Sequence, residues 1–136
     1  MQDLVKGSRF EPLVKPAITR EQLELYAEAS GDKNPIHLDD DVAKKTGLPG
    51  VIAHGMLTMA FFGEFLHQAL AAQGSGRVEE LSCRFKAMAF PGDVITINGH
   101  VRTVDSTYVE CDLEARNQKG DLTAIGHATL SVLTLT

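Results

Sequence analysis

Apolar and polar side chains alternate along much of the second half of the chain. Residues 81–88 and residues 109–116 each place an apolar or small side chain at every second position. A period of two is typical of β-strands with one face in water. A Pro-Gly-Asp turn and an Asn-Gln-Lys-Gly turn precede two further stretches of this kind, at about 93–104 and 121–134. We therefore expect an antiparallel meander of these four strands, with an N-terminal strand near residues 8–14.

A helical pattern occupies part of the first half. Leu23, Tyr26 and Ala27 recur at the spacing of one helix face. Thr19 stands just before them, in a sequence that is typical of a capping box. This pattern predicts a helix over about 20–29.

Turn-forming residues then interrupt the helical pattern. A proline follows Asn34 and disfavours the helical conformation there, so residues 31–37 are predicted to form an ordered loop. Beyond the loop, Asp39 is placed to cap a short helix, and Gly47 is placed to end it.

A long apolar stretch extends from His54 to about Ala72. Its strongly polar side chains are Glu64, His67 and Gln68. The stretch predicts a buried helix that is too short to span a membrane. Such a helix needs a sheet around it, so the predicted fold class is α+β, with an antiparallel sheet wrapped around a long buried helix. The methionines and phenylalanines of the helix are interpreted first as core, with the lining of an acyl tunnel as the alternative.

Size and charge narrow the classes of protein. The chain has 136 residues, of which 43% are hydrophobic, and this size favours one domain over residues 1–136. It contains no uninterrupted apolar segment of membrane-spanning length and no apolar N-terminal signal, so we expect a cytoplasmic protein that is not a membrane protein. A formal net charge of -5 disfavours nucleic-acid binding.

The two cysteines, Cys83 and Cys111, each stand on the apolar side of a strand pattern and outside any CxxC motif. Reduced, buried thiols are therefore favoured over a disulfide. A structural zinc site would need histidines as additional ligands.

The loop at 31–37 contains the residues best suited to chemistry. Asp32 and His37 lie five residues apart, and Asn34-Pro35 between them prevents the stretch from continuing as a helix. A carboxylate and an imidazole in one cleft can share a water molecule, which the carboxylate orients while the imidazole accepts or returns a proton. The pattern indicates hydration chemistry without a metal ion.

The start of the long helix offers a second element of a site. The amide of Gly55 lies where free backbone N–H groups and the positive end of the helix dipole gather. An oxygen that gains negative charge, such as that of a thioester, can be stabilised there. Glycine suits this position because it has no side chain to block close approach.

These segments resemble a known family. The stretch YAEASGDKNPIH, followed by LDDDVAKKTGLPGVIAHGM, resembles the MaoC-like (R)-specific enoyl-CoA hydratases and 3-hydroxyacyl thioester dehydratases. Phe85 and the turn at 91–93 resemble the downstream strand and turn of the same family. The resemblance implies a hot-dog fold and reversible hydration of trans-2-enoyl thioesters, carried on CoA or acyl carrier protein, to (R)-3-hydroxyacyl thioesters in fatty-acid metabolism. It also implies a homodimer, with a heterodimer as the alternative, and no cofactor beyond the pantetheine of the substrate.

The resemblance also implies roles for individual residues. Asp32 and His37 match the catalytic pair, and Asn34 matches the residue that holds the loop. Gly55 matches the glycine whose amide contacts the thioester carbonyl. Two further residues belong to the same oxyanion and substrate-binding region: His54, which supports the turn, and Met56. Some members carry a serine on the long helix where this chain has Gly63, so the resemblance does not fix the local geometry or the acyl-chain preference.

Two other functions are open. In a hot-dog thioesterase, an acidic residue on the long helix would attack or activate water at the thioester carbonyl, and Glu64 is the candidate. A non-catalytic subunit would bind acyl thioesters or support an active partner. The presence of both Asp32 and His37 favours the hydratase over either alternative. No nucleotide, flavin or metal motif accompanies them.

Overall fold

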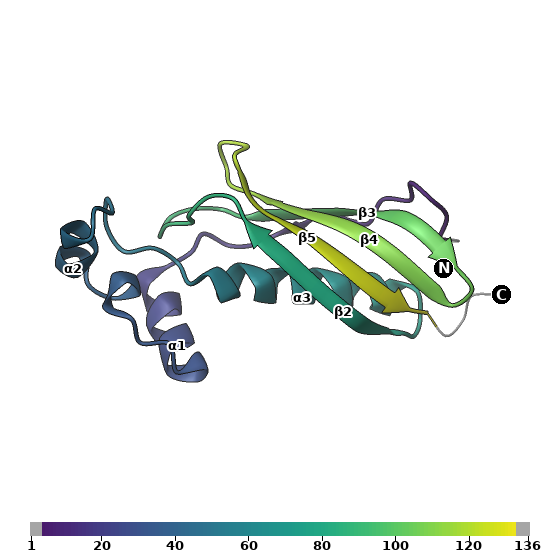
Figure 1. Ribbon diagram of the computed structural model, residues 1–136, viewed down its shortest axis with the longest axis horizontal. Coiled ribbons are helices and arrows are strands. Elements are labelled where there is room, and N and C mark those ends of the chain that lie inside the picture. The colour runs from purple at the N-terminus through teal and green to yellow at the C-terminus, as the bar shows by residue number, and fades with distance from the viewer. Residues whose placement is uncertain (1–3, 133–136) are drawn as a thin grey trace.

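The computed structural model describes residues 4–132, and they form a curled antiparallel sheet packed against one long helix (Figure 1). The strands lie in the order β1-β3-β4-β5-β2. Their bounds are β1 Leu13–Val14, β2 Arg77–Phe85, β3 Thr96–Asp105, β4 Tyr108–Arg116 and β5 Leu122–Ser131. The predicted hot-dog architecture is confirmed.

The predicted four-strand meander is only partly right. Strands β3, β4 and β5 do form a meander, but β2 pairs with β5 and lies at the far edge of the sheet. A meander needs a tight turn between successive strands, whereas residues 86–95 form a long connection from β2 to β3. The amides of Lys86 and Ala87 bond the Thr123 carbonyl, which holds the start of this connection beside β5. Pairing between distant strands has no local signal in the sequence.

The N-terminal strand is also shorter than predicted. Only Leu13–Val14 pairs with β3 as a strand, and Arg9 forms one isolated bridge with His100. The last predicted strand is observed as β5, while residues 133–134 of that prediction lie outside the described residues.

The short helices start and end where the sequence predicts. Helix α1, Arg20–Ser30, begins at Thr19, whose hydroxyl accepts a hydrogen bond from the Gln22 amide at 3.0 Å. It ends at Gly31, which has a φ of 80°. Helix α2, Asp40–Lys45, has Asp39 as its N-cap. Gly47 follows its last turn. Both helices lie beyond one end of the sheet (Figure 1).

Helix α3, Gly55–Ala72, runs along the concave side of the sheet (Figure 1). One of its faces is buried in the core, through Leu57, Thr58, Phe61, Phe62, Phe65, Leu66 and Leu70. The prediction of a helix buried on nearly every side is wrong for the opposite face, where Met56 is 56% exposed and Ala60 is also exposed. The sheet covers only one side of the helix, which explains the difference. The three phenylalanines of α3 are core residues, as the first interpretation held.

Both cysteines have free thiols. Cys111 is buried, and burial raises the pKa of its thiol to about 12. Cys83 is only partly buried, and burial raises its pKa as well. Neither thiol is activated. The prediction of buried thiols is confirmed for Cys111 and is only partly right for Cys83. No helix within residues 4–132 is long and apolar enough to cross a membrane, and the cytoplasmic location stays a prediction.

Candidate active site

The loop between α1 and α2 is ordered by its own polar side chains. The Asp32 carboxylate accepts a hydrogen bond from the Asn34 amide at 3.2 Å, and the Asn34 side chain accepts one from the Ile36 amide at 3.2 Å. These bonds lead into a short 3₁₀ helix, η1, Pro35–His37, for which Asn34 is the N-cap. Asn34 therefore holds the loop, as predicted, and these consecutive Asx turns bring Asp32 close to His37.

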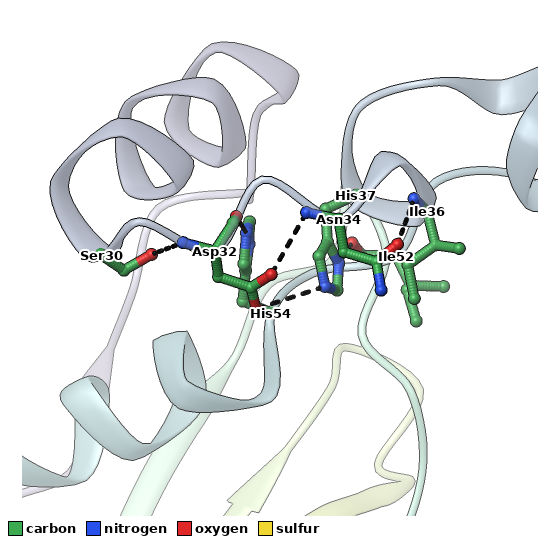
Figure 2. Close-up of polar contacts among 7 residues, drawn as sticks. All are labelled: Ser30, Asp32, Asn34, Ile36, His37, Ile52 and His54. Carbon is green, nitrogen blue, oxygen red and sulfur yellow. Dashed lines mark hydrogen bonds and ion pairs between the residues drawn. The ribbon is translucent and has the colours of Figure 1, made fainter.

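The Asp32 carboxylate and the His37 ring face each other across a short gap (Figure 2). Asp32 Oδ2 lies 3.9 Å from His37 Nε2. This separation is too long for a direct hydrogen bond, but one water molecule can contact both atoms. The Asp32 side chain is 53% exposed and the His37 side chain only 9%, so the pair opens to solvent on the side of the carboxylate. The predicted catalytic residues do lie together.

The protonation pattern of His37 follows from its second contact. His37 Nδ1 lies 2.7 Å from the Ile52 carbonyl oxygen. A carbonyl oxygen can only accept a hydrogen bond, so Nδ1 carries the proton in this arrangement. In the neutral ring, Nε2 then has the free lone pair, and this is the atom that faces Asp32. The contact with Ile52 thus orients His37 to accept a proton from a water in the gap.

His54 connects the loop to the start of α3. Its Nε2 lies 3.0 Å from the backbone carbonyl oxygen of Asp32, and its ring stacks on the His37 ring at 3.8 Å between centroids. The Tyr26 ring contacts it edge-on from α1. The side chain is 1% exposed. His54 therefore supports the site from behind.

Gly55 is the first residue of α3, so its amide has no acceptor within the helix. The ring of Phe85, at the end of β2, packs against this glycine: a Cβ on Gly55 would lie 3.0 Å from Phe85 Cζ. A side chain at this position would have to displace the Phe85 ring by a few tenths of an ångström. Phe85 is 48% exposed, and Met56, which follows Gly55 in the chain, is 56% exposed. The role of Met56 in binding stays a prediction.

Asp32, His37 and His54 also offer donor atoms that all lie within 4.8 Å of one another. One carboxylate and two imidazoles are ligands that zinc accepts. However, the two imidazole rings lie within 22° of parallel. The lone pairs of stacked rings do not converge on one point, and one nitrogen of each ring is already bonded to a carbonyl oxygen. This arrangement fits a water molecule better than a metal ion.

Sequence reasoning missed two contacts of the site. The acceptor for His37 is the backbone oxygen of Ile52, and a backbone atom has no sequence signal. The helical spacing of Tyr26 predicts only that it lies on one face of a helix with Leu23 and Ala27, and its contact with His54 depends on tertiary packing. Glu64, the candidate of the thioesterase alternative, forms an ion pair with Lys15 at 2.8 Å.

The chain is similar to known proteins in sequence and in fold. Residues 6–119 match the family model described as the MaoC like domain. The fatty acid synthase beta subunit TOXC of Cochliobolus carbonum is 33% identical over 110 residues, which cover 79% of this chain and 5% of that protein. The peroxisomal enoyl-CoA hydratase 2 of Arabidopsis thaliana is 33% identical over 92 residues, which cover 67% of this chain and 30% of that protein. The chain thus spans less than a third of the length of either relative.

A solved structure is similar over nearly the whole chain. The (R)-hydratase from A. caviae involved in PHA biosynthesis has a TM-score of 0.86 and 29% sequence identity, over 97% of this chain and 99% of that one. The similarity thus includes both the sheet and the loop that holds Asp32 and His37. With its residues 6–119 matching the family model, this chain belongs to the MaoC-like dehydratase family.

Proposed function

We propose that the protein catalyses the reversible hydration of trans-2-enoyl thioesters to (R)-3-hydroxyacyl thioesters. The observation on which this rests is the 3.9 Å gap between Asp32 Oδ2 and His37 Nε2, with the opposite nitrogen of His37 bonded to a carbonyl oxygen. Membership of the MaoC-like family and the similarity to an (R)-hydratase support the same reaction.

In this mechanism a water molecule lies between Asp32 and His37. His37 Nε2 accepts a proton from the water while Asp32 orients it, and the hydroxyl adds to C3 of the substrate. Negative charge then develops on the thioester oxygen, which the Gly55 amide and the positive end of the α3 dipole stabilise. The proton returns to C2 on the same face, which completes the addition of water and restores the neutral imidazole.

The substrate supplies its own activation in this scheme. The thioester carbonyl polarises the double bond, so the proposal needs no cofactor other than the pantetheine of CoA or of an acyl carrier protein. The stereochemistry, the carrier and the place of the reaction in fatty-acid metabolism are parts of the proposal, suggested by the names of the relatives.

We further propose that the chain acts as a homodimer. Strand β2 is an edge of the sheet, and an unpaired edge can accept another strand. Beside it, the uncovered face of α3 exposes Met56, and the end of β2 exposes Phe85. A second copy would cover both. Sedimentation of the purified chain tests this proposal, and we expect a particle with twice the mass of one chain. If the chain forms a heterodimer instead, it will sediment as a monomer until its partner is added.

Incubation of the purified protein with crotonyl-CoA tests the proposed reaction. We expect the absorbance of the enoyl thioester to fall and (R)-3-hydroxybutyryl-CoA to form, and we expect Lys119→Ala, a change in the exposed turn between β4 and β5, to behave as the wild type. The same assay with longer enoyl chains and with carrier-protein thioesters tests further substrates. If every one of these substrates stays intact, the hydratase proposal is wrong and a non-catalytic binding subunit replaces it.

Release of free thiol would identify a thioesterase instead. Because Glu64 is engaged with Lys15 at the surface, we expect no thiol release above the background, and no effect of Glu64→Gln on hydration. Thiol release that Glu64→Gln removes would establish the alternative.

A further inference from the structure

We propose that His54 is a positioning residue that fixes the distance between the water-activating loop and the Gly55 amide. The proposal rests on the proposed hydratase function, because it assigns those two elements to one reaction. It concerns a side chain that acts from behind the site and does not contact the substrate.

The contacts of His54 join three separate segments. Its backbone is the N-cap of α3 and directly precedes Gly55. Its side chain reaches back across the site, where Nε2 lies 3.0 Å from the Asp32 carbonyl oxygen and the ring stacks on His37. Tyr26 of α1 closes the other side, with 4.8 Å between ring centroids. One residue therefore connects both members of the catalytic pair to the helix start (Figure 2).

The burial of His54 excludes a direct catalytic role in this arrangement. The side chain is 1% exposed, so neither substrate nor bulk water reaches it. The Asp32 carbonyl can only accept a hydrogen bond, so Nε2 of His54 is the donor. The ring thus holds its proton in a bond to the backbone, where it cannot take part in the hydration step.

The hydrogen bonds of His54 give only a partial gain in stability. With Nε2 as the donor, the neutral ring has its free lone pair on Nδ1, and this atom is buried without a hydrogen-bond partner in the part of the chain that the structure describes. A buried polar atom without a partner destabilises the folded state. An aromatic hydrocarbon ring would fill the same space between Tyr26 and His37 without that penalty. What such a ring would lack is the donor to Asp32.

Loss of that donor should act on the chemical step. The Asp32 carbonyl would be released from the helix start, and the carboxylate and the Gly55 amide would no longer be held at one separation. A displacement of about 1 Å in a site that must contact both ends of the reacting group can reduce the rate by about 10²-fold. Substrate affinity depends mainly on the acyl chain and the carrier, so KM should change far less than kcat.

The test compares two variants of His54 with a control. His54→Phe keeps the ring stack and removes both nitrogens. Because the loss of the bond to the Asp32 carbonyl is offset by the removal of the unpartnered Nδ1, we expect a melting temperature close to that of the wild type, with a fall in kcat of about tenfold to 10²-fold. His54→Gln retains an N–H donor at a similar reach and should recover part of the lost kcat. Leu66→Ala is the control, because Leu66 is equally buried on α3; it should lower the melting temperature and leave the kcat of the folded enzyme unchanged.

Three results would overturn the inference. The first is a His54→Phe enzyme with the kcat of the wild type. The second is a fall in kcat that merely follows a fall in melting temperature, as in any destabilised core variant. Should His54→Phe not fold, His54→Leu and His54→Gln provide the comparison, since the two side chains are similar in size and only glutamine has a donor. The third overturning result is an equal kcat for these two variants at similar melting temperatures.

The failure of this inference is distinguishable from that of the proposed function. An inactive wild type would overturn both. An active wild type that loses activity in Asp32→Asn but not in His54→Phe would leave the hydratase proposal intact and remove the role of His54.

Discussion

The sheet with its helix and the loop region of residues 31–54 are held together by different forces. Helix α3 and strands β3–β5 share a core of apolar side chains, among them Phe62, Phe65 and Ile97, all of which are almost inaccessible to solvent. Residues 31–54 add Val51 and Ala53 to this core, and the rest of the segment is fixed largely by bonds to backbone atoms, including those of His37 to Ile52 and of His54 to Asp32. The active-site candidates all lie in the second region or at its junction with α3.

This difference separates stability from activity. Apolar burial has no directional requirement, but a core loses much free energy when volume is removed. A polar loop contributes less free energy, but its hydrogen bonds fix directions and separations, which a catalytic site requires. Substitutions in the sheet and helix should therefore change the free energy of unfolding, and substitutions in the loop should change kcat.

The largest effect on stability is expected at Phe62. Its ring is fully buried and packs against the backbone at Gly126. Phe62→Ala should reduce the free energy of unfolding by about 3–5 kcal/mol, because it removes a large apolar side chain and leaves a cavity. Denaturant unfolding measures this change, with the exposed Leu25→Ala as a control that should have little effect. If kcat of the folded Phe62→Ala enzyme fell as far as we expect for substitutions in residues 31–54, the separation of stability from activity would be contradicted.

An intermediate effect is expected at the junction of the two regions. In Gly55→Ala the new methyl group would meet the Phe85 ring at 3.0 Å. We expect a loss of about 1–3 kcal/mol in stability from this overpacking, together with a fall in kcat/KM. Adding Phe85→Leu should restore stability but not activity, because the methyl group still covers the amide. Phe85→Leu alone is the control. Recovery of both properties would mean that the glycine serves only the packing of Phe85.

A smaller effect is expected from the carboxylate that supports the loop from α2. The Val51 amide and the Arg20 guanidinium bond Asp40 and hold the pKa of its carboxyl below the ordinary value of 3.8. A lowered pKa means that the folded state favours the charged form. The resulting stability is fully present above pH 3.8 and disappears as the pH falls through the folded value.

The measurement for Asp40 is the pH dependence of unfolding. Asp40→Asn should unfold more easily than the wild type at neutral pH, and the difference should shrink as the pH is lowered below 3.8. Asp41→Asn is the matched control, as a neighbouring carboxylate of the same first turn. A difference that stays constant down to low pH would show that the charge of Asp40 is not what stabilises the loop.

The smallest effect is expected at Gly63 on α3. A Cβ at this position would meet no atom within 4 Å, so Gly63→Ser fits without strain in one copy of the chain. The higher helix propensity of serine should raise stability by a few tenths of a kcal/mol. Thermal unfolding checks this, with Ala60→Ser at an exposed position of the same helix as the comparison. A large loss of stability would mean that the proposed partner copy packs tightly against Gly63.

The sequence allowed accurate prediction where local chemistry decides the structure. The caps at Thr19 and Asp39 follow from the hydrogen-bonding needs of helix ends, and both are observed. The Asp32 and His37 pair could also be predicted, because five residues with a proline between them leave few local conformations. That residues 1–136 form one domain stays a prediction.

Contacts between distant segments could not be predicted in this way. The pairing of β2 with β5 depends on a crossing of the chain at residues 86–95, which no local pattern indicates. The exposed face of α3 begins with the apolar Met56 and Ala60, and an apolar sequence does not reveal whether its cover comes from the same chain. The acceptor for His37 is a backbone oxygen. Every residue type has such an oxygen, so the identity of the residue gives no sign of the contact.

The most direct test of the proposed mechanism is the activity of Asp32→Asn measured together with its melting temperature. Asparagine keeps the side-chain oxygen that accepts a hydrogen bond from the backbone amide of Asn34, so the Asx turn can persist while the negative charge disappears. For the hydration of crotonyl-CoA, or of the best enoyl thioester found, we predict a fall in kcat/KM of about 10²-fold or more at a nearly unchanged melting temperature. An Asp32→Asn enzyme as active as the wild type would show that the carboxylate serves only the turn and would contradict the assignment of the catalytic pair.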